Sequence, residues 1–311
     1  TMRKKIALIG AGNIGGTLAQ LISLKELGDI VLLDIFEGMP KGKSLDLSQS
    51  SSIEGFHADF KGTSSFKNIK NSDVVIVTAG FPRKPGMSRD DLIGTNAKIV
   101  KTVTENIIKY SPDCIIIIVS NPLDVMTYQA HLTSKFPREK IMGMAGILDT
   151  GRFRTFLAEE LDVSVNSIDA YVLGGHGDSM VPLLKATTVG GVPVEELIEK
   201  NRLEEIVQRT RDGGAEIVAH LKTGSAYYAP SAAVAQMVDA IIFDTKEVFP
   251  CAAMLDGEYG ISGVYAGVPV KLGGSGIEEI VNLNLSQSEK DGLTASSKAV
   301  EELIEVMKGQ S

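Results

Sequence analysis

The sequence predicts an α/β protein, with an N-terminal doubly wound parallel sheet followed by a C-terminal α+β domain. In the first half, short apolar runs alternate with segments of helical periodicity, and a glycine-rich loop joins the first run to the first helix. In the second half, strand-like pieces are linked by glycine-rich turns. The 311 residues suffice for about two domains, which we expect over residues 1–145 and 146–311.

Apolar runs in the first half predict buried parallel strands, because strands covered on both faces are apolar throughout. These runs are Lys5–Ile9, Ile30–Leu33, Val74–Val77 and Cys114–Val119. Helical spacing follows the first run, and a long periodic segment at 89–109 predicts a helix between the last two. Ligands of such sheets bind at the carboxyl ends of the strands.

The second half predicts helices and hairpins. The predicted helices lie near residues 151–161, 195–221, 225–243 and 286–308. The strand-like pieces lie near residues 168–173, 181–189, 247–255 and 262–270. Short turns between the pieces favour hairpins over crossovers. We expect the two halves to pack tightly, with a cleft between them.

Composition excludes several classes of partner. A net charge of −8 argues against a nucleic-acid surface, which needs clustered Lys and Arg. No apolar run approaches the roughly 18 residues that cross a bilayer. Cys114 and Cys251 lie in or beside apolar runs without metal-like spacing, so we expect buried thiols in a reducing compartment. The sequence predicts a cytoplasmic protein with no membrane, nucleic-acid or metal partner.

A glycine-rich loop follows the first predicted strand and opens a helix. Its residues are Gly10, Ala11, Gly12, Asn13, Ile14 and Gly15. Such glycines let a pyrophosphate approach the backbone, and the helix N-terminus offers amides and partial positive charge. Asp34 ends the second strand, where its carboxylate can accept both ribose hydroxyls and repel a 2′-phosphate. NAD is therefore favoured over NADP. The loop alone also suits FAD, and a loop without a ligand is the simpler alternative.

An acid, an arginine and a histidine form the candidate catalytic group. Asp149 and Arg152 are three residues apart, so on a helix both point to one face. His176 follows in Gly174–Ser179, a glycine-rich turn that leaves its ring accessible. Asp149 would fix the imidazole tautomer, and the other nitrogen would exchange a hydroxyl proton as hydride moves to or from nicotinamide. Arg152 would hold a substrate carboxylate in a bidentate pair.

Each member of this group alone has a simpler explanation. Asp149 and Arg152 could form an ordinary surface ion pair, and His176 could be a turn histidine with structural hydrogen bonds. We assign that structural role to His57, His131 and His220, which lack such neighbours in the sequence. Only the joint arrangement is specific. Together with the glycine-rich loop it indicates hydride transfer to or from a small hydroxy acid.

A basic loop at residues 80–89 follows the predicted strand Val74–Val77. It should rise from the carboxyl edge of the sheet as a lid that excludes water. Arg89 is a candidate for polarising a carbonyl oxygen as charge develops there, and Arg83 for meeting a second carboxylate. A solvated basic loop is the simpler alternative.

Val119, Ser120 and Asn121 end another predicted strand at the same edge, where we expect cofactor contacts. Asn121 offers an amide to the cofactor ribose or to the substrate hydroxyl. Its position before Pro122 is equally typical of a turn asparagine, which is the competing explanation.

These motifs resemble, in this order, those of the lactate/malate dehydrogenase family, and the resemblance covers essentially the whole chain. The matching segments are the glycine-rich loop, Asp34, Pro82–Arg89, Ser120–Pro122, Asp149–Arg152 and Gly174–Ser179. The resemblance implies an NAD-binding Rossmann domain, with His176 as proton donor and acceptor paired with Asp149. It implies Arg152 on the substrate carboxylate and Arg89 on the carbonyl.

The resemblance also implies NAD contacts from Asn96 and Asn121, a further substrate contact from Asn121, and a homodimer or homotetramer. Arg83 falls on the family's discriminating position, where lactate enzymes carry glutamine, so malate and oxaloacetate are the implied substrates. A charge-assisted pair to a second carboxylate contributes roughly 1.5–3 kcal/mol. Pyruvate would leave Arg83 unpaired. The two effects together, on the order of 3–5 kcal/mol, predict a preference of roughly 10²–10⁴-fold.

Three alternatives compete with this interpretation. The closest is a lactate dehydrogenase. NAD-using glycosidases share the architecture but need a metal, and no Cys/His cluster in the sequence supplies one. A catalytically silent NAD-binding sensor would need a gap in the catalytic group, and the sequence has none.

Overall fold

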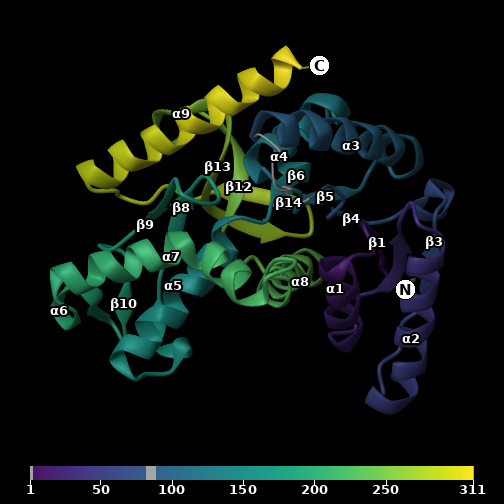
Figure 1. The fold of residues 1–311 in the computed structure, drawn as a ribbon, viewed down its shortest axis with the longest axis horizontal. Helices are drawn as coiled ribbons and strands as arrows, with labels where there is room; N and C mark the ends of the chain where they lie inside the picture. The colour runs from purple at the N-terminus through teal and green to yellow at the C-terminus, as the bar shows by residue number, and fades with distance from the viewer. Residues whose placement is uncertain (1–2, 82–88, 311) are drawn as a thin grey trace.

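The computed structural model describes residues 3–81 and 89–310, and one sheet runs through both halves of the chain (Figure 1). Its first part is parallel. In spatial order the parallel strands are β3 (Phe60–Thr63), β2 (Asp29–Leu33), β1 (Lys5–Ile9), β4 (Val74–Val77), β5 (Ile115–Ile118) and β6 (Ile141–Gly143). The apolar runs predicted as strands are therefore strands, and β4 and β5 are buried at every residue. The sequence did not predict β3 and β6.

Helices cover both faces of this parallel part, so the sheet is doubly wound as predicted. The helices of the first half are α1 (Asn13–Leu24), α2 (Gly38–Glu54), α3 (Arg89–Tyr110) and α4 (Leu123–Ser134). In Figure 1, α3 and α4 lie on one side of the strands with α9, whereas α1 lies on the other side against α8. The core between the layers consists of fully buried Ile, Leu and Val side chains from β1, β4 and β5.

The sheet continues into the second half through antiparallel strands. These are β12 (Val248–Asp256), β13 (Ser262–Gly273), β14 (Gly276–Ile280), β8 (Val172–Gly174) and β9 (Met180–Pro182). The junction pairs Ala252 of β12 with Gly143 of β6. A second sheet contains β7 (Ile168–Asp169), β10 (Thr188–Val189) and β11 (Val192–Pro193). The predicted hairpins are confirmed, because β8 with β9 and β12 with β13 are antiparallel neighbours.

The helices of the second half are α5 (Gly146–Leu161), α6 (Val194–Leu197), α7 (Lys200–Leu221), α8 (Tyr228–Phe243) and α9 (Gln287–Gly309). Helices lie at three of the four predicted segments, whereas the segment predicted near 195–221 divides into the two helices α6 and α7 because the backbone is extended at Ile198. Single 3-10 turns lie at Phe66–Ile69, Arg138–Lys140, Val165–Ser167 and Glu258–Gly260. None of the helices in the described residues is long and apolar enough to span a membrane.

Two predicted strands, 168–173 and 181–189, were wrong as single elements. The first divides into β7 and β8, and the second into β9 and β10, with the members of each pair in different sheets. The chain leaves the small sheet after β7 and enters the large sheet at β8, at residues 170–171. The apolar residues of this run therefore belong to two separate hydrophobic clusters. Cys114 and Cys251 are buried free thiols, as expected, and burial raises the pKa of Cys114 to about 12.

Candidate active site

The glycine-rich loop between β1 and α1 is built for close backbone approach. Gly10 has a φ of 115°, and a Cβ there would lie 2.4 Å from Thr78 Oγ1, so only glycine fits this turn. Gly12, which precedes the helix, has no side chain to cap it, and a Cβ added there would meet nothing within 4 Å among the described residues. The N-terminus of α1 thus has no side-chain cap, which leaves its first amides available to a bound phosphate.

Asp34 is held at the end of β2, beside this loop. Its Oδ2 accepts a hydrogen bond from Ala11 N at 2.7 Å, and its Oδ1 accepts one from Phe36 N at 3.2 Å. Lys43 of α2, which the sequence did not single out, donates to Gly12 O at 2.7 Å. Burial lowers the pKa of Lys43, and the charge of Asp34 opposes that shift. The loop, the carboxylate and the helix N-terminus together fit a dinucleotide.

The loops after β4 and β5 are tied together by buried polar side chains. Asn96 of α3 accepts from Phe81 N at 2.9 Å and donates to Asn121 O at 2.7 Å. Ser120 Oγ donates to Ala79 O at 2.5 Å. The side chains of Asn96 and Ser120 thus brace the carboxyl edge of the sheet. Whether they also touch NAD directly, as the sequence predicted, stays a prediction.

The structure describes only some of the other residues predicted at this edge. Val119 is buried at the end of β5, and Asn121 is exposed beside it. Arg83 lies outside the described residues. Arg89 is the first residue of α3, but its side chain also lies outside the described part of the chain.

His176, Asp149 and Arg152 come together as the sequence predicted. His176 Nδ1 lies 2.8 Å from Asp149 Oδ2, and Arg152 Nη1 lies 3.3 Å from Asp149 Oδ1. Helix α5 begins at Gly146, a turn earlier than predicted, so it includes both Asp149 and Arg152 and presents them on one face. The Asp149 side chain is only 2 % exposed. One buried carboxylate therefore orients both the imidazole and the guanidinium.

The pKa of His176 is raised above its ordinary value. Burial acts against the charged form, but the charge of Asp149 and its hydrogen bond outweigh burial. Arg152 lowers the pKa of His176, and Asp124 raises it. The raised pKa favours the protonated imidazole, the form that general acid catalysis requires.

Asp124 is a site residue that the sequence analysis missed. It lies in the first turn of α4, 5 % exposed, and its Oδ2 accepts a hydrogen bond from His176 N at 3.0 Å. Its Oδ1 is buried and has no hydrogen-bond partner among the described residues. Burial raises the pKa of Asp124 to about 6, against the hydrogen bond from His176. The sequence signal was only a lone acid shortly after the predicted strand Cys114–Val119, in a segment where no helix was predicted.

The turn that bears His176 is also held from α9. Ser296 Oγ accepts from Gly175 N at 2.7 Å. Gly174 has a φ of 84°, and a Cβ there would lie 2.8 Å from Ser296 Oγ. Asp124 of α4 and Ser296 of α9 therefore both bind backbone amides of this hairpin turn. Their hydrogen bonds fix the position of the His176 backbone, from which the imidazole side chain extends.

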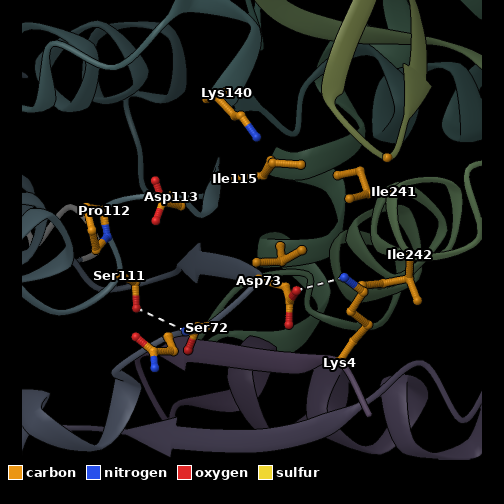
Figure 2. Close-up of a pocket in the computed structure, with 13 residues that line it drawn as sticks. Lys4, Ser72, Asp73, Ser111, Pro112, Asp113, Ile115, Lys140, Ile241 and Ile242 are labelled. Atoms are coloured by element: carbon orange, nitrogen blue, oxygen red, sulfur yellow. Dashed lines mark hydrogen bonds and ion pairs between the residues drawn. The ribbon is translucent and has the colours of Figure 1, made fainter. Parts of the chain in front are cut away.

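A cavity of about 340 Å³ lies at the opposite, amino ends of the same parallel strands (Figure 2). Lys4 Nζ binds Asp73 Oδ1 at 2.8 Å, and Ser72 N donates to Ser111 Oγ at 3.1 Å. These polar groups satisfy each other. None of the residues predicted to act on substrate or cofactor lines this cavity. In the described part of the chain, no group of three or more His, Cys, Asp or Glu side chains is placed to hold a metal ion.

Comparisons with known proteins agree with this geometry. Residues 4–143 match the family model for the lactate/malate dehydrogenase NAD binding domain, and residues 147–310 match that for the alpha/beta C-terminal domain. A malate dehydrogenase of Chloroherpeton thalassium is 53% identical over 302 residues, 97% of each chain. The structure of a malate dehydrogenase from Salinibacter ruber is similar at a TM-score of 0.94 and 49% identity, over 98% of each chain.

A lactate dehydrogenase from Cryptosporidium parvum, solved with lactic acid and β-nicotinamide adenine dinucleotide, reaches a TM-score of 0.96 at 42% identity, over 99% of each chain. The fold and the site define an NAD-dependent dehydrogenase. The chain belongs to the lactate/malate dehydrogenase family. Because lactate and malate enzymes share this fold equally well, the choice of substrate must depend on local residues.

Proposed function

We propose that the chain acts as an NAD-dependent malate dehydrogenase, interconverting (S)-malate and oxaloacetate by hydride transfer through His176 and Asp149. The central observation is the 2.8 Å contact between His176 Nδ1 and the buried Asp149 Oδ2, with Arg152 on the same carboxylate. Relatives named malate dehydrogenase at 53% and 54% identity support the substrate class.

Proton transfer is the task of His176. In reduction, protonated His176 donates its Nε2 proton to the carbonyl oxygen of oxaloacetate, and neutral His176 takes that proton back from malate in oxidation. The nicotinamide cofactor, when bound, would accept the hydride as NAD⁺ in malate oxidation and supply it as NADH in oxaloacetate reduction. Asp149 accepts the Nδ1 hydrogen bond, which fixes the tautomer and stabilises the imidazolium. The raised pKa of His176 supports this role.

Arg152 binds the carboxylate next to the reacting carbon. Its Nε is buried and lacks a hydrogen-bond partner among the described residues, and its side chain is 14% exposed. A guanidinium in this state favours a planar anion that forms two parallel bonds. Arg89 polarises the carbonyl, and Asn121 contacts substrate and cofactor.

The cofactor lies along the carboxyl edge of the parallel strands. The contacting residues are Gly10, Ala11, Gly12, Asn13, Ile14, Gly15, Asp34, Asn96, Val119, Ser120 and Asn121. Asp34 takes the ribose hydroxyls, and the first amides of α1 take the pyrophosphate. The tight turn at Gly10 and the free space beside the Gly12 Cα support this placement.

Arg83 selects the dicarboxylate by pairing with the second carboxylate of oxaloacetate. The test compares kcat/KM for oxaloacetate and pyruvate in the native chain and in Arg83→Gln. The native chain should favour oxaloacetate roughly 10²–10⁴-fold, and the variant should lose most of that ratio. Equal losses on both substrates, or a native preference for pyruvate, would contradict the proposal.

We also propose a homodimer or homotetramer, cytoplasmic location, and domains over residues 1–145 and 146–311. Exposed apolar side chains on α2, at Met39, Leu45 and Ile53, support self-association. The free buried cysteines fit a reducing compartment. The matched family segments end at residue 143 and resume at 147, which supports the boundary. Sedimentation velocity would measure the number of copies.

A further inference from the structure

Two consecutive glycines, Gly213 and Gly214, lie inside the 22-residue helix α7. Glycine is the least favourable residue in a helix interior after proline, because it loses the most backbone freedom. Close approach by a neighbouring group is one packing reason for a glycine at such a place. In α7 that reason lies on the neighbouring helix α5, which packs against it (Figure 1).

The α7 backbone runs along the side chain of Arg152. A Cβ added at Gly213, which is buried, would lie 3.1 Å from Arg152 Cδ and 3.5 Å from Nε. A Cβ added at Gly214 would lie 3.6 Å from Nη2 and 3.9 Å from Nη1. The first approach is closer than carbon atoms normally pack, whereas the second is ordinary contact. The two glycines therefore differ in how strongly a methyl group would press on Arg152.

Arg152 has little freedom to move away. Its Nη1 is held 3.3 Å from Asp149 Oδ1, and Asp149 is itself held by His176 at 2.8 Å. A displaced guanidinium would lose its alignment with a substrate carboxylate and also disturb the acid that orients the imidazole. The missing side chain at residue 213 thus sets the position of a functional cation 61 positions earlier in the sequence.

We propose that Gly213 is a positioning residue, whose lack of a side chain lets Arg152 lie flat against α7 in the orientation that binds the substrate carboxylate. This inference rests on the proposed role of Arg152. According to this inference, α7 affects the affinity for the hydroxy acid through its backbone at Gly213 and not through a side chain that contacts the substrate.

The experiment compares Gly213→Ala with Gly214→Ala in the full chain. Gly213→Ala should raise the KM for oxaloacetate about 3–10-fold. A misplacement of about 1 Å in a substrate-positioning group can lower activity roughly 100-fold, and we expect the Arg152 guanidinium to shift by only a few tenths of an ångström. Gly214→Ala should change the KM less than about twofold. Both should keep the dissociation constant for NADH. Gly214→Ala should not lower the melting temperature, since alanine favours the helix and its Cβ makes only ordinary contact.

A double substitution separates positioning from a general effect on the helix. In an Arg152→Ala background the contacted Cδ is missing, so adding Gly213→Ala should leave the KM unchanged. Additive losses would overturn the inference, as would equal effects of the two glycine substitutions or an unchanged KM in Gly213→Ala. An Arg152→Ala variant that retains its affinity for oxaloacetate would instead refute the proposed role of Arg152 itself.

Discussion

The two ends of the central parallel strands differ in how their polar groups are satisfied. At the amino ends, the lining of the cavity in Figure 2 includes groups that pair with each other, Lys4 with Asp73 and Ser72 with Ser111. At the carboxyl ends, Asp124 Oδ1 and Arg152 Nε are buried without a partner among the described residues, and the space beside the Gly12 Cα is empty to 4 Å. The cavity at the amino ends is therefore a poor guide to chemistry in this protein.

This difference has a physical basis. A buried polar atom without a partner destabilises the folded chain by about 1–3 kcal/mol, and use by a ligand or a reaction is one reason for such an atom to persist. Polar groups that already bind each other gain little from a ligand. The substitutions below test this contrast at both ends of the strands.

The largest effect is expected at His176. His176→Asn should lower kcat about 10²–10⁴-fold, the usual contribution of general acid–base catalysis, with NADH affinity nearly unchanged. In the native chain, oxaloacetate reduction should decline as pH rises through the raised pKa of His176, above the ordinary 6.5, because a neutral imidazole cannot donate. Stopped-flow rates and fluorescence titration with NADH measure both. A comparable loss of NADH binding would indicate a structural role.

A smaller effect is expected at Asp124. Asp124→Asn keeps an oxygen that can accept from His176 N but removes the charge, so kcat/KM should fall about 5–10-fold, equivalent to roughly 1 kcal/mol. Because the carboxylate raises the pKa of His176, its loss should move the alkaline decline of oxaloacetate reduction to lower pH.

The matched control for Asp124 is Glu289→Gln. Glu289 is also a buried carboxylate, but it belongs to the capping box of α9 and its bonds are to Ser286. The pH profile of this control should match that of the native chain. An unchanged profile in Asp124→Asn would show that Asp124 does not act on His176.

The smallest effect is expected at the amino-end cavity. Asp73→Asn removes the ion pair with Lys4 but keeps an acceptor for Lys5 N, so the free energy of unfolding should fall by about 0.2–1 kcal/mol. The kcat/KM for oxaloacetate should stay within about twofold. Urea unfolding and steady-state rates measure the two quantities. A loss of more than about fivefold in kcat/KM would mean that the cavity is coupled to the reaction.

Local features of the sequence predicted most of the first half. β1 and β4 agree with their apolar runs residue for residue, because central parallel strands are buried on both faces. β3 was missed because Phe60–Thr63 contains a lysine and a glycine and lies at the sheet edge. β6 has only three residues, too short for any periodic pattern.

In the candidate site too, local motifs predicted some residues, whereas others are identified only by long-range packing. The glycine-rich loop and Asp34 lie within 25 residues, and their backbone role follows from a short motif. The spacing of Asp149 and Arg152 predicted a shared helix face, and the structure places them there. Asp124 contacts a residue 52 positions away, so only the packing of α4 on the hairpin turn identifies it. Gly213 likewise depends on the packing of α7 on α5.

The pairing of Gly143 with Ala252 has a consequence for how the chain comes apart. A Cβ at Gly143 would lie 2.7 Å from Thr127 Oγ1 and 3.0 Å from Ala252 Cβ, so the two halves meet without spare space. If either half unfolds, the edge strand of the other half, β6 or β12, loses its hydrogen-bonded neighbour. Heating should therefore unfold residues 1–145 and 146–311 in one cooperative transition. Neither half should be stably folded when it is expressed alone.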